Sequence, residues 1–212
     1  MAPRSRSTRQ IATFLSRADP VLARVIRRTG AKRVPQAEAS FESLAQTIVN
    51  QQISGKAGEA IVNRLLQLHG GRRFPPPNWF LETSAEKLRS AGLSPQKTTY
   101  VKDLAFRVSQ HDLEFRKLPH LSDEEVIRTL TAVKGIGLWS AQMCLMFSLN
   151  RPDVLPTGDL GIRKAVARLW GYQSLPAEST VRRHGKRWAP FRSHASFYLW
   201  MSLDLPLGRG NV

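Results

Sequence analysis

Residues 130–141 read LTAVKGIGLWSA, and this stretch decides how the rest of the chain is interpreted. One helix is predicted to end near Ala132, a tight turn contains Gly135 and Gly137, and a second helix is predicted to begin near Trp139. Glycine accepts positive φ and leaves no side chain between the backbone and a ligand. The N–H groups that open the second helix have no partner inside it and carry partial positive charge, which suits a phosphate. A plain helical corner, in which the glycines only end a helix, is the alternative.

A second stretch, VLPTGDLGIR at 154–163, places Asp159 at the start of the next predicted helix. An aspartate at such a position often only caps the helix. Asp159, however, follows Trp139 by twenty residues, so one helix and a loop can return it beside the glycine turn. A carboxylate close to a phosphate-binding turn repels DNA. Its presence there therefore favours a task that needs negative charge.

The charge balance favours a polyanionic partner. The chain has 212 residues, of which 42% are hydrophobic, and a formal net charge of +16. A domain this basic usually binds a polyanion, and nucleic acid is the leading candidate. A membrane surface is disfavoured because no stretch pairs a basic face with an apolar face over several turns. A basic surface that serves only solubility is the alternative.

Cysteine usage and apolar runs limit the class of protein further. The single cysteine, Cys144, lies in an apolar run and is interpreted as a small buried hydrophobe. One cysteine excludes an intrachain disulfide, a zinc site built from several thiolates and a four-cysteine iron–sulfur cluster. Neither a transmembrane helix nor a secretory signal is expected. We therefore expect a protein that is not secreted and that lies in the cytoplasm or nucleoid of a bacterium, or in the nucleus of a eukaryote.

The remaining residues predict helices joined by short loops, with no alternating strand pattern. Capping boxes are expected at Thr83 with Glu86 and at Ser122 with Glu125, and residues 72–80, RRFPPPNWF, are expected to form a loop. The expected helices cover about residues 8–29 with a break at Pro20, 41–49, 55–69, 84–91, 95–109, 123–132, 139–149, 159–170, 178–187 and 191–203. The predicted fold class is all-α.

Four ordered segments together resemble a known family. They are FESLAQTIVNQQIS at 41–54, LTAVKGIGLWSAQM at 130–143, LPTGDLGIRKA at 155–165 and WAPFRSHASFYLW at 188–200. In this order they are similar to the helix-hairpin-helix superfamily of DNA glycosylases, and within it to the 3-methyladenine DNA glycosylase II group. The resemblance implies a two-lobed helical fold with the active-site cleft between the lobes, in the short form without the N-terminal β domain.

The resemblance also implies how the chain is divided. Residues 1–40 would form a basic N-terminal arm and helices that pack with the C-terminal lobe. Residues 41–150 would form a central helical lobe that ends in the helix-hairpin-helix. Residues 151–212 would form the C-terminal helical lobe that carries the catalytic aspartate.

Individual residues take roles from the resemblance. Asp159 matches the catalytic aspartate, whose carboxylate stabilises an oxocarbenium-like sugar and orients or deprotonates the attacking water. The residues implied for the base pocket are Trp139, Trp200 and Met143. Core packing is the alternative for the two tryptophans, although a π-face suits a cationic base.

DNA binding is assigned in the same way to two turns. Gln52, with Ile53 and Ser54, resembles the wedge turn that enters the minor groove and fills the space of a flipped base, a polar helix end being the alternative. The hairpin residues implied in DNA binding are Lys134, Gly135, Ile136 and Gly137. The main-chain carbonyls implied to hold a structural Na⁺ or K⁺ are those of Thr131, Val133 and Ile136. No cofactor is implied for the chemistry.

Three positions depart from patterns found in the superfamily. Trp139 stands where glycosylase–lyases carry a lysine, and tryptophan has no amine to attack the sugar, so lyase activity is not expected. Gly158 stands where relatives often carry a second acidic residue. Lys134 replaces a proline often found in the hairpin and is compatible with a phosphate contact.

The leading hypothesis is a monomeric, monofunctional glycosylase that acts on duplex DNA in base excision repair. It would flip alkylated bases of the 3-methyladenine and 7-methylguanine type and hydrolyse their N-glycosidic bond. A non-catalytic module that binds distorted or damaged DNA is the alternative from another class. A third hypothesis keeps the enzyme and changes the lesion to uracil, a mismatched base or oxidised guanine.

Overall fold

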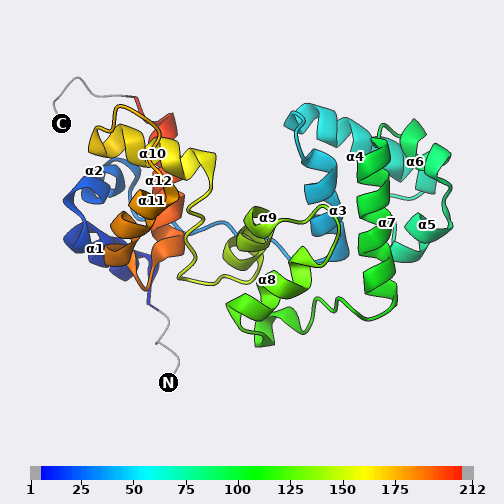
Figure 1. Ribbon diagram of the computed structural model, residues 1–212, viewed down its shortest axis with the longest axis horizontal. Helices are drawn as coiled ribbons and strands as arrows, with labels where there is room; N and C mark the ends of the chain where they lie inside the picture. Colours follow the sequence, from blue (N-terminus) through cyan, green and yellow to red (C-terminus); the bar gives the residue numbers. More distant parts are fainter. Residues whose placement is uncertain (1–5, 207–212) are drawn as a thin grey trace. The chain divides into compact units, whose positions relative to one another are not determined.

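The computed structural model describes residues 6–206, and within that range it contains helices and no strand (Figure 1). The predicted all-α fold class is confirmed for this part of the chain. Residues 1–5 of the expected basic arm lie outside the described residues. None of the described helices is long and apolar enough to span a membrane.

Two compact units make up the chain. One consists of residues 37–149, and the other combines the residues before 37 with those after 149. Each unit has its own buried apolar side chains.

The unit of residues 37–149 is built around α7 (Pro95–Ser109), which contacts both α3 (Phe41–Asn50) and α5 (Pro77–Glu82) (Figure 1). Its side chains Val101, Leu104 and Ala105 are buried in that packing. The other helical elements of this unit are α4 (Gly55–His69), α6 (Ala85–Ser90), the 3₁₀ turn η1 (Leu118–His120), α8 (Asp123–Thr131), α9 (Leu138–Met143) and the π-helical turn η2 (Cys144–Ser148). Cys144 is buried as expected, and burial raises the pKa of its thiol.

Two local predictions in this unit are wrong. Residues 77–80 are helical, because Pro77 opens α5 at a position where its fixed φ is favourable and its missing N–H costs nothing. Thr83 is the C-cap of α5 and not the N-cap of α6, and its hydroxyl donates to the carbonyl of Trp79 at 2.6 Å. Ser84 caps α6 instead, by accepting from the N–H of Lys87.

The capping box predicted at the start of α8 is confirmed. The Ser122 hydroxyl accepts from the N–H of Glu125, and the Glu125 carboxylate accepts from the N–H of Ser122 at 2.7 Å. Both bonds satisfy N–H groups that would otherwise have no partner at the helix start. The helix that leads into the glycine turn therefore begins where the sequence predicts.

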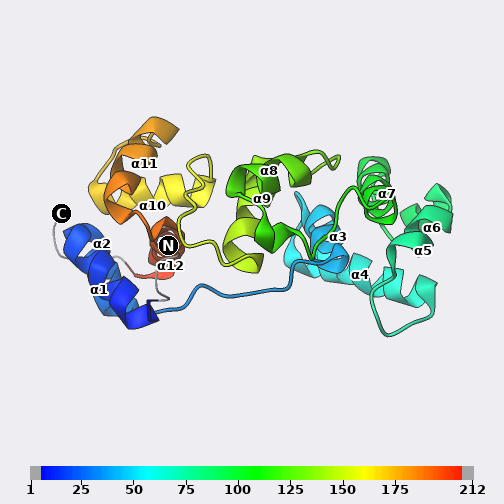
Figure 2. The same ribbon diagram turned by 90° about the horizontal axis from the view of Figure 1, so that it is seen from below.

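The other unit packs α12 (Arg192–Asp204) against α2 (Pro20–Thr29) and α10 (Leu160–Trp170), segments far apart in the sequence (Figure 2). Its remaining helices are α1 (Thr8–Ala18), α11 (Glu178–Gly185) and the 3₁₀ turn η3 (Lys186–Trp188). Large side chains fill the core of this unit, including Leu15, Leu22, Trp188 and Tyr198.

A fully buried carboxylate joins the N-terminal helices to this core. Asp19 caps α2 by accepting from the N–H groups of Val21 and Leu22, and it also accepts from the indole N–H of Trp188 at 2.9 Å. A guanidinium nitrogen of Arg187 lies 3.7 Å from the same carboxylate. Buried charge is tolerated only when it is paired and hydrogen-bonded, and Asp19 meets both conditions.

Candidate active site

The glycine turn between α8 and α9 uses its two glycines differently. Gly135 has φ +82, and a Cβ there would run into the ring of Tyr100 on α7, so both the backbone conformation and the close approach require glycine. Gly137 has φ −94 and serves as the extended N-cap of α9. A Cβ on Gly137 would meet nothing within 4 Å. Gly137 therefore leaves open space at the start of α9 without needing an unusual conformation.

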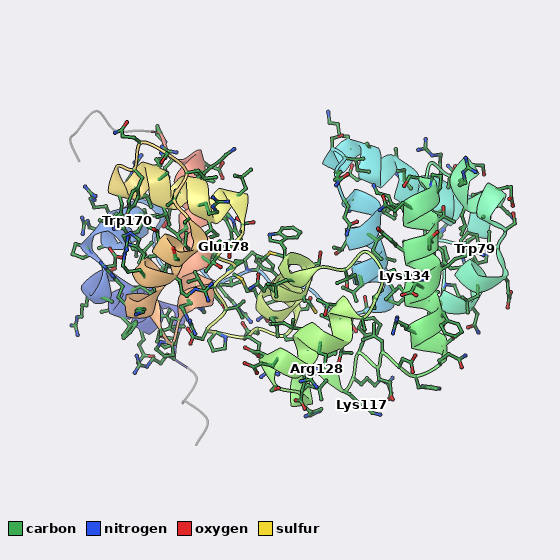
Figure 3. The ribbon with its side chains drawn as sticks, viewed as in Figure 1. Trp79, Lys117, Arg128, Lys134, Trp170 and Glu178 are labelled. Carbon is green, nitrogen blue, oxygen red and sulfur yellow. The ribbon has the colours of Figure 1, made fainter. Side chains whose placement is uncertain are left out.

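Asp103 on α7 anchors the same turn. Its carboxylate accepts from the backbone N–H of Lys134 at 2.9 Å and from the guanidinium of Arg107 at 3.0 Å. The Lys134 ammonium lies 4.0 Å from Asp103, and its side chain is 63% exposed, on the side of the turn that faces α7 (Figure 3). Ile136 is buried, so only its backbone is available to a ligand. The turn thus offers backbone groups and one cation to the surface.

The predicted wedge turn joins α3 to α4. Gln52 adopts a left-handed backbone with φ +56, which is unusual for a residue other than glycine. Its side chain is exposed, and Ile53 is 37% exposed. Ser54 caps α4 by accepting from the N–H of Ala57. Strained backbone of this kind persists where the surroundings hold it, and it clusters at functional sites.

Two side chains that the sequence analysis missed hold the wedge turn in place. The Lys97 ammonium donates to the carbonyls of Val49 and Gln51, each at 2.7 Å, and its burial lowers the pKa of the lysine. The Gln51 side-chain amide donates to the carbonyl of Gly135 at 2.8 Å. The wedge turn and the glycine turn are therefore bonded to each other and to α7. No sequence pattern marked Lys97, because a lysine on a helix normally faces solvent.

A pocket of about 630 Å³ opens beside these turns, within the size range of ligand sites. Trp139 and Met143 line it, as does Gln52, so three predicted site residues are brought together. Its other lining residues are Ala37, Ser43, Leu44, Gln46, Thr47, Asn50, Gln51, Ser140, Cys144, Phe147 and Ser148.

Two polar side chains of the pocket wall, on α3, donate hydrogen bonds within their own helix. The Thr47 hydroxyl donates to the carbonyl of Ser43 at 2.9 Å, and the Gln46 amide donates to the Glu42 carboxylate at 3.0 Å. A hydroxyl and an amide that donate in this way still carry acceptor lone pairs. Together with the π-face of Trp139, this wall suits an occupant that is positively charged or donates hydrogen bonds.

Asp159 lies in the other unit, at the N-cap of α10. Its Oδ1 accepts from the N–H of Ile162 at 2.7 Å and from the indole N–H of Trp200 at 2.8 Å. The capping role considered from the sequence is therefore real, and the bond from Trp200 is additional to it. Trp200, predicted for the base pocket with Trp139, donates to the carboxylate of Asp159 within its own unit.

Gly161 leaves the room that Trp200 needs to reach Asp159, and the sequence analysis missed it. A Cβ on Gly161 would lie 2.9 Å from a ring carbon of Trp200 and 3.0 Å from Asp159 Oδ1. Real Cβ atoms essentially never approach other heavy atoms more closely than this. Any larger residue would force the tryptophan or the carboxylate to move.

A second carboxylate stands beside the turn that carries Asp159. The Thr157 hydroxyl donates to Glu178 at 2.7 Å, and a Cβ on Gly158 would lie 3.3 Å from the same carboxylate (Figure 3). An acidic side chain at position 158 would therefore meet the negative charge of Glu178. Negative charge near this turn comes from the start of α11 instead. Within residues 6–206, no group of histidine, cysteine or acidic residues is arranged to hold a metal ion.

Residues 45–191 match the family model described as the HhH-GPD superfamily base excision DNA repair protein. The chain belongs to this superfamily. The wedge turn, the glycine turn and Asp159 all fall inside the matched range, and the resemblance inferred from the four sequence segments is confirmed.

Relatives within the HhH-GPD superfamily are similar over most of this chain. The DNA-3-methyladenine glycosylase 1 of Schizosaccharomyces pombe is 36% identical over 166 residues, which are 78% of this chain and 73% of that protein. The DNA-3-methyladenine glycosylase of Saccharomyces cerevisiae is 40% identical over 139 residues, but these are 62% of this chain and 47% of that protein.

Solved structures of the superfamily share the fold. The DNA-3-methyladenine glycosidase of Bacillus halodurans is 37% identical with a TM-score of 0.82, and the match covers 91% of this chain and 88% of that one. The 3-methyladenine DNA glycosylase of S. pombe in complex with abasic DNA is 33% identical with a TM-score of 0.82, over 92% of this chain and 97% of that one.

Proposed function

We propose that the protein is a monofunctional DNA glycosylase that excises alkylated bases, of the 3-methyladenine and 7-methylguanine type, from duplex DNA. The observation that carries this proposal is the carboxylate of Asp159, held at the start of α10 by the N–H groups of Trp200 and Ile162. Two donors on one oxygen fix the orientation of the whole carboxylate. Relatives named DNA-3-methyladenine glycosylase support the same reaction.

The proposed catalytic role of Asp159 is electrostatic. As the N-glycosidic bond breaks, positive charge develops on the sugar, and a fixed carboxylate stabilises it and orients the attacking water. An alkylated purine already carries positive charge, which makes it a good leaving group that needs little acid assistance. One carboxylate is therefore sufficient for hydrolysis, and the proposed products are a free base and an abasic site.

The pocket beside the wedge turn supports the choice of base. Trp139 and Met143 supply a π-face and a polarizable side chain, and the Thr47 hydroxyl and one N–H of the Gln46 amide donate within α3. An electron-rich wall of this kind favours a cationic base over a neutral one. Trp139 has no amine, and no lysine lines the same pocket, so it offers no amine nucleophile for a lyase reaction.

DNA is proposed to bind through the two turns. Gln52, with Ile53, would enter the minor groove and occupy the space of the flipped base, which offsets part of the unstacking cost. Ser54, at the start of α4, would contact the DNA backbone. Lys134 and the backbone of residues 135–137 would contact phosphate oxygens. These contacts are consistent with a protein that acts as a monomer in the nucleoid or the nucleus and is not secreted.

A monovalent cation is proposed at the carbonyls of Thr131, Val133 and Ile136. Thr131 is the last residue of α8, and carbonyls in a last helical turn have no partner within the helix and carry partial negative charge. The carbonyl of Gly135 accepts from Gln51 and is not in the proposed set. Within the set, the Val133 carbonyl accepts from the N–H of Ile136 at 3.1 Å, and its second lone pair can still bind an ion. The residues present therefore fit such an ion, whose charge would draw a phosphate to the turn.

The test is base release from methylated duplex DNA by the wild-type protein, by Asp159→Asn and by Asp204→Asn, a control at an exposed aspartate that ends α12. We expect the wild type and the control to release 3-methyladenine or 7-methylguanine, and strand breaks to appear only after alkali. Asp159→Asn should bind DNA and release bases slower by orders of magnitude. Full activity in Asp159→Asn, or tight binding by the wild type without release, would overturn the proposal.

A further inference from the structure

The N-terminal helices α1 and α2 carry a strongly basic outer surface that the proposed active site does not use. Over residues 6–36 the only acidic residue is Asp19, which is fully buried and bonded to Trp188. The basic residues of this range, all exposed, are Arg6, Arg9, Arg17, Arg24, Arg27, Arg28, Lys32 and Arg33. The positive charge on the outer surface is therefore not neutralised by its own segment.

Part of this charge gathers in a groove along α1 and α2, which lie side by side (Figures 1 and 2). Arg9, Thr13 and Arg17 line two adjoining hollows, one of which also contains Arg6 and the other Arg27. Residues four apart on a helix share a face, so the first three form one row along α1. The two arginines of this row are about 12 Å apart along the helix axis. Several successive phosphates of one DNA strand fit within that span.

None of the ion pairs among residues 6–206 involves Arg9, Arg17 or Arg27. A row of exposed cations without acidic neighbours repels itself and destabilises the folded state slightly. Such an arrangement is stabilised when a polyanion covers it. Arginine is also the side chain that binds phosphate in a bidentate way, through the fork of its guanidinium.

Arg6 at one end of the groove is held in place by aromatic rings. Its guanidinium lies 5.3 Å from the ring centroid of Phe191 and 5.8 Å from that of Phe14. The two rings themselves pack edge to face at 5.3 Å. A stacked guanidinium keeps its edge N–H groups available for hydrogen bonds. Arg6 therefore loses little conformational freedom when it binds an anion.

We propose that the α1–α2 groove binds the phosphate backbone of undamaged duplex DNA, as a contact separate from the wedge turn, the glycine turn and Asp159. The charged side chains of the groove are all arginines, and its one amide, that of Gln10, already accepts from the N–H of Ser7 through its oxygen. Contacts to phosphates position a protein without reading bases, so the contact is independent of sequence. It would hold the protein on DNA before a lesion is met. This inference goes beyond the proposed glycosylase activity and does not depend on it.

The experiment compares the full-length wild type with Arg9→Gln/Arg17→Gln/Arg27→Gln in binding an undamaged DNA duplex over a series of salt concentrations. Each lost phosphate contact makes the plot of log K against log salt shallower by about 0.9, so the slope should fall by about 2 to 3. The affinity should fall roughly tenfold or more. A slope equal to that of the wild type would overturn the proposal.

Two matched variants separate a binding surface from a general effect of charge. The α6 variant, Arg72→Gln/Lys87→Gln/Arg89→Gln, removes the same charge from exposed positions on α6 and in the loop after α4, and we expect it to bind like the wild type. Arg9→Lys/Arg17→Lys/Arg27→Lys keeps the charge and should keep most of the salt dependence. Equal losses in the α6 variant and the groove variant would show a net-charge effect and contradict the proposal.

The alternative polyanion and the independence from catalysis are tested with the same proteins. If the groove variant lost affinity for single-stranded RNA but not for duplex DNA, the proposed partner would be wrong. Glutamine retains helix propensity, and thermal unfolding followed by circular dichroism should show equal stability. Because undamaged DNA releases no base, this result stands or falls separately from base release by the wild type.

Discussion

The indole N–H of Trp200 donates a 2.8 Å hydrogen bond to Oδ1 of Asp159, across 41 residues of sequence. The same oxygen accepts from the N–H of Ile162, so the carboxylate is held both by the helix it caps and by a side chain of α12. A carboxylate held from two directions has a defined orientation before substrate arrives, and such preorganisation lowers the barrier to reaction.

Trp200→Phe removes this bond and keeps an aromatic ring, although a smaller one. We expect base release under single-turnover conditions to slow by about 10 to 100-fold, because misplacement of a reacting group costs this much. Binding to abasic DNA should change less than the rate does. Trp200→His, which can restore an N–H donor, should recover part of the rate. A Trp200→Phe protein as fast as the wild type would show that Trp200 does not position Asp159.

Gly161→Ala tests the same relationship without changing either partner. The new Cβ would lie 2.9 to 3.0 Å from Trp200 and Asp159, so we expect the pair to separate and base release to slow by about tenfold or more. Alanine favours a helix over glycine by about 1 kcal/mol, so a loss of fold is not expected from the backbone. Gly55→Ala, where a Cβ meets nothing within 4 Å, is the control for thermal stability. Unchanged base release in Gly161→Ala would mean that the helix shifts to accommodate the methyl group.

Lys97→Met should loosen the wedge turn. The ammonium of Lys97 holds two carbonyls at the end of α3, and hydrogen bonds from charged groups contribute about 1.5 to 3 kcal/mol. Base flipping can be measured in the Asp159→Asn background by the fluorescence of 2-aminopurine placed beside a lesion. We expect the equilibrium constant for flipping to be roughly tenfold smaller in the Lys97→Met protein.

The control for this variant is Lys102→Met. Lys102 lies on the same helix and also donates to a carbonyl, that of Leu81 at 3.4 Å, but away from the wedge turn. The Lys102→Met protein should be less stable than the wild type but should flip the base equally well. If both variants flipped DNA equally well, Lys97 would have only a structural role.

Acid should destabilise the unit that carries Asp159 through its histidines. Burial, and then Arg187, lowers the pKa of His184 below its ordinary value of 6.5, and burial does the same for His194. As the pH falls, the histidines of the unfolded chain therefore bind protons before those of the folded chain. The free energy of unfolding is consequently highest above pH 6.5, where these histidines are neutral in both states, and it falls as the pH drops below 6.5. His184→Gln should flatten this dependence in thermal melts between pH 7 and pH 5, whereas His120→Gln at an exposed position should leave it unchanged.

Much of the local structure could be predicted from the sequence because the signals are local. Ser40, Ser54, Ser94 and Ser122 cap helices where the pattern of polar and apolar residues places them. The error at Thr83 arose because its neighbour Ser84 is an equally good cap, and only the bond from Thr83 to Trp79 decides between them.

By itself, the sequence determined the helical class, the glycine turn, the wedge turn and the aspartate at the start of α10, since each is written in a contiguous run of residues. Only the tertiary structure decided that Lys97 holds the wedge turn, that Gln51 joins it to Gly135, and that Trp200 holds Asp159. These bonds join residues 41 to 84 positions apart in the chain. Hydrogen bonds of that range depend on how helices pack, and helix packing leaves no periodic signal at the positions it brings together.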